Sequence, residues 1–177
     1  MKKQFLTFVL TLVVLAIGFT IYIYSGSYDV SQLTPHNSLT RKIISVTTHH
    51  SINKRLKEIK VPPLYDTALF AEGFRHYNEM CVICHGAPGI EPSEMCEGLY
   101  PRPPKFYKSD DMPDPDEAFW IIKNGIKLTS MPAFGPTHTD AKIWAITAFM
   151  LKKMNTMTPA EYLHQQTGEM NMKKAGE

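Results

Sequence analysis

The chain has 177 residues, of which 44% are apolar and 11% are aromatic, and its formal net charge is +2 at pH 7. Enough apolar surface is present to build a packed core, so the composition excludes an intrinsically disordered chain. The small charge, with no block rich in Lys and Arg, excludes nucleic acid as an expected partner.

The first predicted element is an uncharged apolar run that follows Lys2 and Lys3 and ends at Tyr24. About 20 apolar residues cross a bilayer, so residues 1–24 are expected to form a retained signal-anchor helix, with residues 4–24 in the lipid. A cleaved signal peptide is the alternative, although its apolar region is usually about 7–15 residues long. The two lysines favour a single-pass topology with the rest of the chain outside the cytoplasm.

Residues 25–65 are polar and uneven, and we expect them to form an extracytoplasmic linker. Within this segment Ile52, Leu56 and Ile59 recur at helical spacing among basic residues, which predicts an amphipathic helix. Such a helix either rests on anionic lipid headgroups or packs on the domain that follows, and the pattern leaves both alternatives open.

A domain is expected over residues 66–167, followed by a polar tail over residues 168–177. Asp66, Asp114 and Thr158 stand where helix N-caps are expected, ahead of runs with helical periodicity. The predicted helices cover residues 66–81, 114–124 and 139–151, and a short last helix begins at residue 158. No strand pattern is found, so the fold class is all-α, with about four helices in the domain and one transmembrane helix before it.

The sequence Cys-x-x-Cys-His at residues 81–85 falls where the first helix of the domain ends. A thioredoxin-like redox pair needs a βαβ context, and a structural zinc site needs four ligands, usually as two spaced pairs. A disulfide between Cys81 and Cys84 gives no role to His85. Covalent haem attachment uses all three residues, because both thiols form thioethers with the vinyl groups and the imidazole ligates the iron. We therefore predict one covalently attached haem c.

A second axial ligand is sought downstream of the motif. Met131 lies in a proline-containing loop, residues 130–135, with a predicted helix on either side. A thioether ligand suits haem iron in electron carriers and raises the reduction potential. His138 is the alternative and would give bis-histidine ligation. The prediction is therefore a site in which His85 and Met131 ligate the iron.

These residues resemble the membrane-anchored, single-haem class I c-type cytochromes of bacteria. The resemblance rests on the haem motif at residues 81–86, on the loop at residues 131–134 and on the helices before, between and after them. It covers roughly residues 66–164 and implies a cytochrome c-like fold around one haem.

In that family a glycine and an aromatic residue of the first helix cross the carboxyl-terminal helix. Gly73 and Tyr77 occupy the corresponding positions relative to Cys81, and Ile146 and Phe149 supply the expected partners. The resemblance therefore predicts a close helix crossing at Gly73.

The resemblance implies two further contacts. A proline carbonyl after the haem motif accepts a hydrogen bond from the ligand imidazole, and Pro88 and Pro92 are the candidates for His85. Arg102 is expected to pair with a haem propionate, the alternative being an exposed loop arginine. Cys96 is left over as a third thiol, and we expect it to be a small buried residue, the alternative being a surface thiol.

The expected function is that of a one-electron carrier, tethered to the bacterial cytoplasmic membrane with its haem domain on the periplasmic side. Its expected partners are membrane-bound respiratory complexes or other redox proteins, and no catalysis of its own is expected. One alternative is a fixed haem c subunit of a larger membrane oxidoreductase complex. A further alternative is a haem-based sensor in which a ligand displaces Met131.

Overall fold

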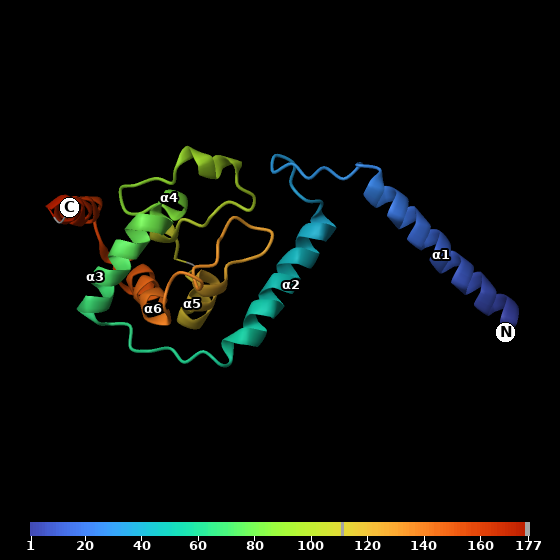
Figure 1. Ribbon diagram of the computed structural model, residues 1–177, viewed down its shortest axis with the longest axis horizontal. Coiled ribbons are helices and arrows are strands. Elements are labelled where there is room, and N and C mark those ends of the chain that lie inside the picture. Colours follow the sequence, from blue (N-terminus) through green and yellow to red (C-terminus); the bar gives the residue numbers. More distant parts are fainter. Residues whose placement is uncertain (111, 176–177) are drawn as a thin grey trace. The chain divides into compact units, whose positions relative to one another are not determined.

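The computed structural model describes residues 1–110 and 112–175 (Figure 1). Over these residues the regular elements are all helical, and the single β-type contact is an isolated bridge between Ala87 and Ile90. The predicted all-α fold is therefore confirmed. The chain forms two compact units, Met1–Pro35 and His36–Glu177.

The α-helices are α1 Lys2–Tyr24, α2 Ser38–Leu56, α3 Thr67–His76, α4 Val82–His85, α5 Pro115–Asn124, α6 Asp140–Ala148 and α7 Pro159–Ala175. Two π-helical turns, Tyr77–Cys81 and Phe149–Lys153, continue α3 and α6. Short 3-10 turns cover Glu94–Gly98, Phe106–Lys108 and Met154–Thr156.

In the first unit, α1 is long and apolar enough to cross a membrane, with a mean hydropathy of 2.5. Its few polar side chains satisfy themselves inside the helix. Thr7, Thr11 and Thr20 each donate a hydroxyl hydrogen bond to the carbonyl four residues earlier, at 3.0, 3.0 and 2.8 Å. Because lipid offers no hydrogen-bond partners, this arrangement suits a helix that lies in a bilayer.

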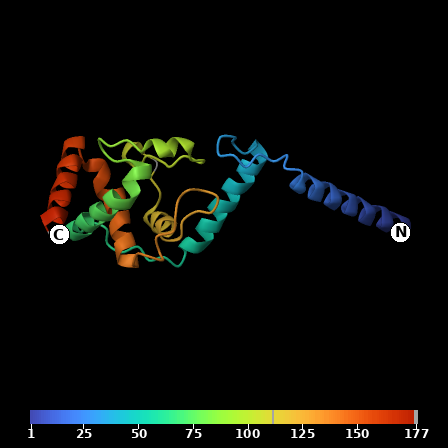
Figure 2. The same ribbon diagram turned by 45° about the horizontal axis from the view of Figure 1, so that its top comes forward.

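In the second unit, α3 and α6 cross at close range, and Figures 1 and 2 show them side by side. A Cβ atom on Gly73 would lie 2.0 Å from the carbonyl oxygen of Ala145 and 2.7 Å from the Cβ atom of Phe149. The close crossing at Gly73 is therefore confirmed, since no other residue type leaves room for it. The backbone opposite is that of Ala145, one residue before the expected Ile146.

Aromatic side chains fill the core beside this crossing. Phe74, Tyr77, Phe149 and Tyr162 are each at most 1% exposed. The ring of Phe74 lies 5.5 Å from that of Phe149 and 5.0 Å from that of Tyr162, and the rings of Tyr77 and Phe149 are 5.7 Å apart. Aromatic pairs at these separations stabilise a fold beyond the area that they bury. These four side chains pack against one another directly, so this part of the core is formed by the protein's own residues.

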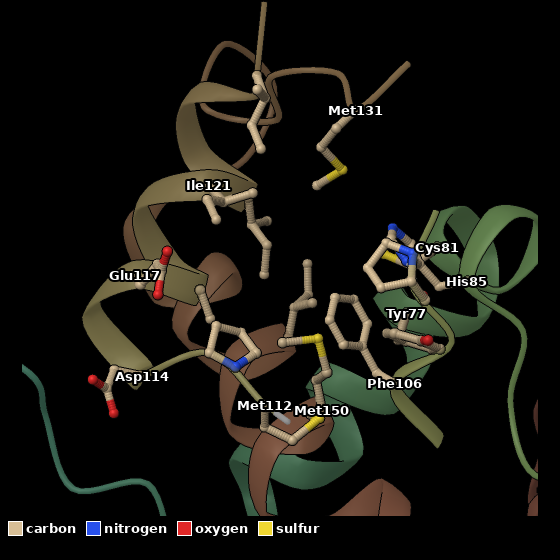
Figure 3. A pocket seen from close by; sticks show the side chains of 16 residues that line it. Tyr77, Cys81, His85, Phe106, Met112, Asp114, Glu117, Ile121, Met131 and Met150 are labelled. Atoms are coloured by element: carbon tan, nitrogen blue, oxygen red, sulfur yellow. The ribbon is translucent and has the colours of Figure 1, made fainter. Parts of the chain in front are cut away.

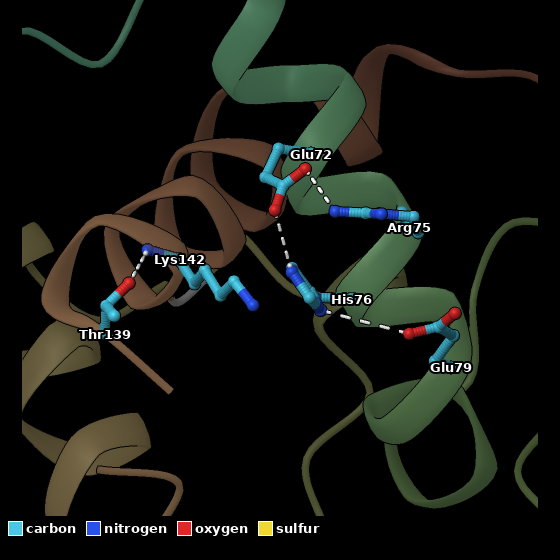
Figure 4. A network of polar contacts seen from close by, with 6 residues as sticks. All are labelled: Glu72, Arg75, His76, Glu79, Thr139 and Lys142. Carbon is cyan, nitrogen blue, oxygen red and sulfur yellow. Dashed lines mark hydrogen bonds and ion pairs between the residues drawn. The ribbon is translucent and has the colours of Figure 1, made fainter. Parts of the chain in front are cut away.

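His76 of α3 is a buried polar residue near the same crossing. The Nε2 atom of His76 lies 2.9 Å from Oε1 of Glu72, which also pairs with Arg75 on the same helix (Figure 4). The His76 ring stands edge-on to that of His138, with ring centres 5.3 Å apart. These contacts join α3 to the loop that leads into α6, whose N-cap Thr139 accepts a hydrogen bond from the amide of Lys142.

Two helix ends differ from the sequence-based expectation. Asp114 makes no side-chain cap at α5, although Pro115 occupies the first turn of this helix. The last helix is not short, because α7 runs for 17 residues into the segment that was expected to be a polar tail. Thr158 and Glu161 form the predicted capping box at its start, with hydrogen bonds of 2.7 and 3.2 Å between side chain and backbone.

The helix α2 packs on α5, within the same compact unit as the rest of the domain. Ile52 on its inner face is buried, and Asn37 caps its start by accepting a hydrogen bond from the amide of Thr40 at 2.9 Å. Of the two alternatives for the amphipathic segment, packing on the domain is therefore observed for this face.

Candidate functional site

A cavity of about 460 Å³ opens between α5 and the turn that carries the Cys-x-x-Cys-His motif (Figure 3). Its walls are mainly apolar, with aliphatic side chains from α5 and α6 on one side. The residues that line it are Tyr77, Cys81, His85, Pro104, Phe106, Met112, Pro113, Asp114, Glu117, Ala118, Ile121, Ile122, Ile126, Met131, Ile146 and Met150. The structure thus brings Cys81, His85 and Met131 to one cavity.

The π-helical turn after α3 sets the position of the motif. It brings Tyr77 and Cys81 to the buried side, and the Tyr77 hydroxyl donates a hydrogen bond of 2.9 Å to the carbonyl of Gly86. Gly86 has φ +67° and ends α4, a backbone conformation that glycine adopts without strain. The buried Tyr77 therefore links the start of the turn before the motif to Gly86, the residue directly after it.

The two thiols of the motif differ in their surroundings. Cys81 is buried, and burial, with a smaller contribution from Cys84, raises the pKa of its thiol to about 12. Cys84 is half-buried and does not line the cavity, and partial burial followed by the neighbouring Cys96 raises the pKa of its thiol too. Both groups therefore remain protonated thiols near pH 7. If a haem vinyl group were attached here, each S–H would add across the double bond, with sulfur on one carbon and hydrogen on the other, and no oxidant would be needed.

The imidazole of His85 is oriented by Pro104. Its Nδ1 atom donates a hydrogen bond of 2.8 Å to the carbonyl of Pro104, which leaves Nε2 as the atom free to bind iron. The expectation that Pro88 or Pro92 plays this part is wrong. Pro104 follows His85 by 19 residues and belongs to a loop that folds back over the motif, so no local pattern identifies it.

Two other effects act on this ring. Phe106 stacks on His85, with ring centres 4.9 Å apart and an interplanar angle of 24°. Burial lowers the pKa of His85, and the hydrogen bond to Pro104 offsets part of this shift. The imidazole is therefore held neutral and in one orientation, as a metal ligand requires.

Glu91 anchors the returning loop from the outside. Its carboxylate pairs with Lys105 at 2.8 Å and with Lys108 at 2.5 Å, on either side of Phe106. These cations, through hydrogen bonds first, lower the pKa of Glu91 from 4.5 to about 2. The pairs are exposed and link the segment just after the motif to the one that positions Pro104.

The loop that carries Met131 is fastened to the carboxyl end of α5. The amides of Phe134 and Gly135 donate to the carbonyls of Ile122 and Lys123 at 3.1 and 2.9 Å, which satisfies two carbonyls that the helix itself leaves unpaired. The thioether of Met131 extends from this loop into the cavity (Figure 3).

Gly125 makes this attachment possible. It ends α5 with φ +65°, and a Cβ atom there would lie 2.8 Å from the carbonyl oxygen of Met131 and 2.8 Å from the amide of Ala133. The Asn124-Gly125 pair is a recognisable signal for the end of a helix. Only the folded structure shows that the absence of a side chain at Gly125 also lets the Met131 loop pack against the end of α5.

Two residues considered for the site, Arg102 and His138, lie elsewhere. Arg102 is 66% exposed, pairs with Glu97 at 2.6 Å and does not line the cavity. His138, the alternative second ligand, packs against His76 and Phe134 and is also absent from the cavity wall. Trp120 faces the groove between α2 and α5 instead of the cavity.

Cys96 is buried beside the motif, as expected for a small core residue. Its thiol donates a hydrogen bond of 3.4 Å to the carbonyl of Ile83, and Oγ of Ser93 lies 3.8 Å away. The third thiol thus packs against the backbone between the two cysteines of the motif.

The sequence-based search missed two carboxylates at the cavity. Asp114 and Glu117, at the amino-terminal end of α5, both line it (Figure 3). Their pattern signalled only helix capping, and they reach the cavity because the first turn of α5 faces it.

The donor set and the cavity fit a haem. Aliphatic walls suit a flat macrocycle, a buried thiol and a free imidazole nitrogen stand on one wall, and a thioether enters from another loop. An all-helical domain that presents Cys-x-x-Cys-His in this way is a c-type cytochrome domain.

Comparison with protein families agrees with this class. Residues 68–150 match the family described as cytochrome c oxidase, cbb3-type, subunit III. This part of the chain is similar to that family of c-type cytochrome domains, and it follows an apolar helix long enough to cross a membrane. Neither the comparison with curated proteins nor that with solved structures gave a match. Haem-based electron transfer is the activity of such a domain.

Proposed function

We propose that the protein is a membrane-tethered one-electron carrier with a single haem, attached through Cys81 and Cys84 and ligated by His85 and Met131. The observation that carries the proposal is that His85 and Met131, which are 46 residues apart in the sequence, reach into one apolar cavity. The haem supplies an iron that accepts and releases one electron.

The residues around the cavity favour electron transfer over catalysis. With His85 and Met131 both bound to it, the iron would have no open coordination position for a substrate. The hydrogen bond from His85 to Pro104 and the attachment of the Met131 loop to α5 would keep both side chains in place when the iron gains or loses an electron. Little rearrangement then accompanies the gain or loss of an electron.

Substitution of the methionine ligand tests this proposal. In Met131→Ala we expect the ferric methionine-sulfur band to vanish and the reduction potential to fall by on the order of 100 mV, a fraction of the roughly 0.8 V over which axial ligands set haem potentials. Met95→Ala is the matched control, because Met95 is exposed and does not line the cavity. An unchanged spectrum and potential in Met131→Ala would contradict the ligand assignment.

We place the anchor in the bacterial cytoplasmic membrane, with the haem domain on the periplasmic side. The single apolar helix α1 and the two lysines before it support this topology. A tether of this kind confines the carrier to the surface on which membrane-bound respiratory partners reside.

A second candidate is a fixed haem subunit of a respiratory oxidoreductase. The printed description of the matching family, an oxidase subunit, favours it. Extraction in mild detergent followed by a measurement of particle size separates the two: a stable large assembly indicates the subunit, and a particle of one chain indicates the carrier. In a haem-based sensor, carbon monoxide would displace Met131 readily, so an unresponsive reduced spectrum excludes that alternative.

A further inference from the structure

Three apolar side chains on one side of α2 are largely exposed. Leu39, Ile43 and Val46 follow one another at intervals of four and three residues, and they are 67%, 57% and 47% exposed. This spacing places them on one stripe of the helix. The buried Ile52 and the half-buried Ile44 lie on the inner face and line the groove beside α5, and Ile43 lies where the stripe adjoins this groove.

Basic residues border this apolar stripe. By helical periodicity Lys42 lies along one edge of the stripe and Lys54 along the other. From residue 30 to residue 57 the chain has five Lys and Arg residues and no Asp or Glu. An apolar stripe between lysines is the pattern of a helix that lies in the headgroup region of a bilayer, where lysine side chains extend toward the phosphates.

A loop of the domain extends the apolar surface. Leu128 is 73% exposed and has φ +62°, a left-handed conformation that side chains rarely adopt. Leu128 and its neighbour Lys127 line the same groove as Ile43. Ile43 of the stripe and Leu128 of this loop therefore border one groove, and Lys127 places a cation beside them.

The anchor keeps α2 within reach of lipid. Residues 25–37 connect the end of α1 to the start of α2, and 13 extended residues span at most about 45 Å. If α1 crosses the bilayer, α2 cannot leave its vicinity. A water-soluble partner is not held near α2 in this way. The excess of positive charge around α2 also complements anionic headgroups.

We propose that the stripe of Leu39, Ile43 and Val46, with Leu128 beside it, binds the surface of an anionic lipid bilayer. This inference rests on the membrane insertion of α1 in the proposed function. The stripe would enter the bilayer to a depth of about 5–10 Å, as interfacial helices do. Because the other face of α2 packs on α5, which lines the cavity, this contact sets the orientation of the haem site relative to the membrane.

The test places spin labels on the haem-loaded full chain in vesicles. Leu39→Cys, Ile43→Cys and Val46→Cys are made in a Cys96→Ser background, and Ser45→Cys is the matched control on an exposed part of α2 away from the stripe. Each label is read by its collisions with oxygen, which concentrates in lipid, and with a nickel chelate, which stays in water.

In vesicles of phosphatidylcholine with phosphatidylglycerol, we expect the three stripe labels to show a several-fold higher ratio of oxygen to nickel collisions than the Ser45 label. The ratio falls in phosphatidylcholine alone, and in the anionic vesicles it falls when Lys42→Gln and Lys54→Gln are combined. The haem spectrum stays unchanged in all of these samples.

Stripe labels as open to nickel as the Ser45 label in anionic vesicles would overturn the inference. Shielding that appears only after a purified redox partner complex is added would also overturn it, because the face would then bind protein. Failure of the proposed function looks different: the chain would not float with the vesicles, or Met131→Ala would leave the haem spectrum unchanged while the labels still entered the lipid.

Discussion

The crossing of α3 and α6 and the loop of residues 86–110 are stabilised in different ways. At the crossing, bulky side chains pack closely around Gly73, whereas the loop is held in place by individual hydrogen bonds. The crossing has fully buried aromatic rings in mutual contact. The loop depends on contacts such as the 2.8 Å bond from His85 to Pro104 and the 2.9 Å bond from the Ser93 amide to the carbonyl of Ile83. The difference indicates that one region stabilises itself and the other relies on what fills the cavity.

The largest expected effect comes from preventing haem attachment. The double variant Cys81→Ala, Cys84→Ala should lose haem and with it a ligand contribution of about 4 kcal/mol or more. Hydrogen exchange should rise most over residues 86–110 and least in α3 and α6, because the loop is held by isolated hydrogen bonds whereas the two helices pack directly on one another. Cys96→Ser is the control that keeps haem. Equal loss of protection from hydrogen exchange in both regions would show that the loop does not depend on the haem more than the helix crossing does.

The crossing itself is broken by one methyl group. Gly73→Ala places a Cβ atom 2.0 Å from the carbonyl oxygen of Ala145, so we expect a loss of about 3 kcal/mol in the free energy of unfolding, seen as a lower melting temperature. Gly168→Ala in α7 meets no atom within 4 Å and should be neutral or stabilising by up to about 1 kcal/mol. Similar melting temperatures for the two variants would contradict the close crossing.

A third substitution separates ligand geometry from stability. Gly125→Ala combines a backbone conformation at φ +65° and ψ −176°, which costs residues other than glycine about 1–3 kcal/mol, with a clash against the carbonyl of Met131. We expect a weaker ferric methionine-sulfur band and a lower potential, because the loop must move away from α5. Gly98→Ala, where nothing lies within 4 Å, serves as the control. An intact band in Gly125→Ala would mean that Met131 does not depend on this attachment.

The smallest expected effect is the pH dependence of the Glu91 pairs. The pKa of Glu91 in the folded state lies near 2, below its ordinary 4.5, so its contribution is complete above pH 4.5 and disappears as the pH falls toward 2. Glu91→Gln should remove this part of the acid dependence, measured by hydrogen exchange of residues 104–108 between pH 6 and about pH 3. Because the pairs are exposed, added salt should reduce the effect in the wild type. Identical acid profiles in wild type and variant would exclude this role.

Much of the helical framework was predictable, because the signals are local. The N-caps Asp66 and Thr158, the glycine after Asn124 and the 3.6-residue periodicity each act within a few residues of chain. The full length of α7 was not predictable, since its polar composition gives no periodic apolar stripe.

The sequence by itself determined the all-helical class, the apolar anchor and the chemistry of Cys81, Cys84 and His85, because residue type and short spacing carry that information. Only the tertiary structure decided that Pro104 orients His85 and that Gly125 gives the Met131 loop its place. It also left Arg102 paired with Glu97 at the surface and brought Asp114 and Glu117 to the cavity. Such contacts join residues that are distant in the chain, and their partners are set by how helices pack and loops return.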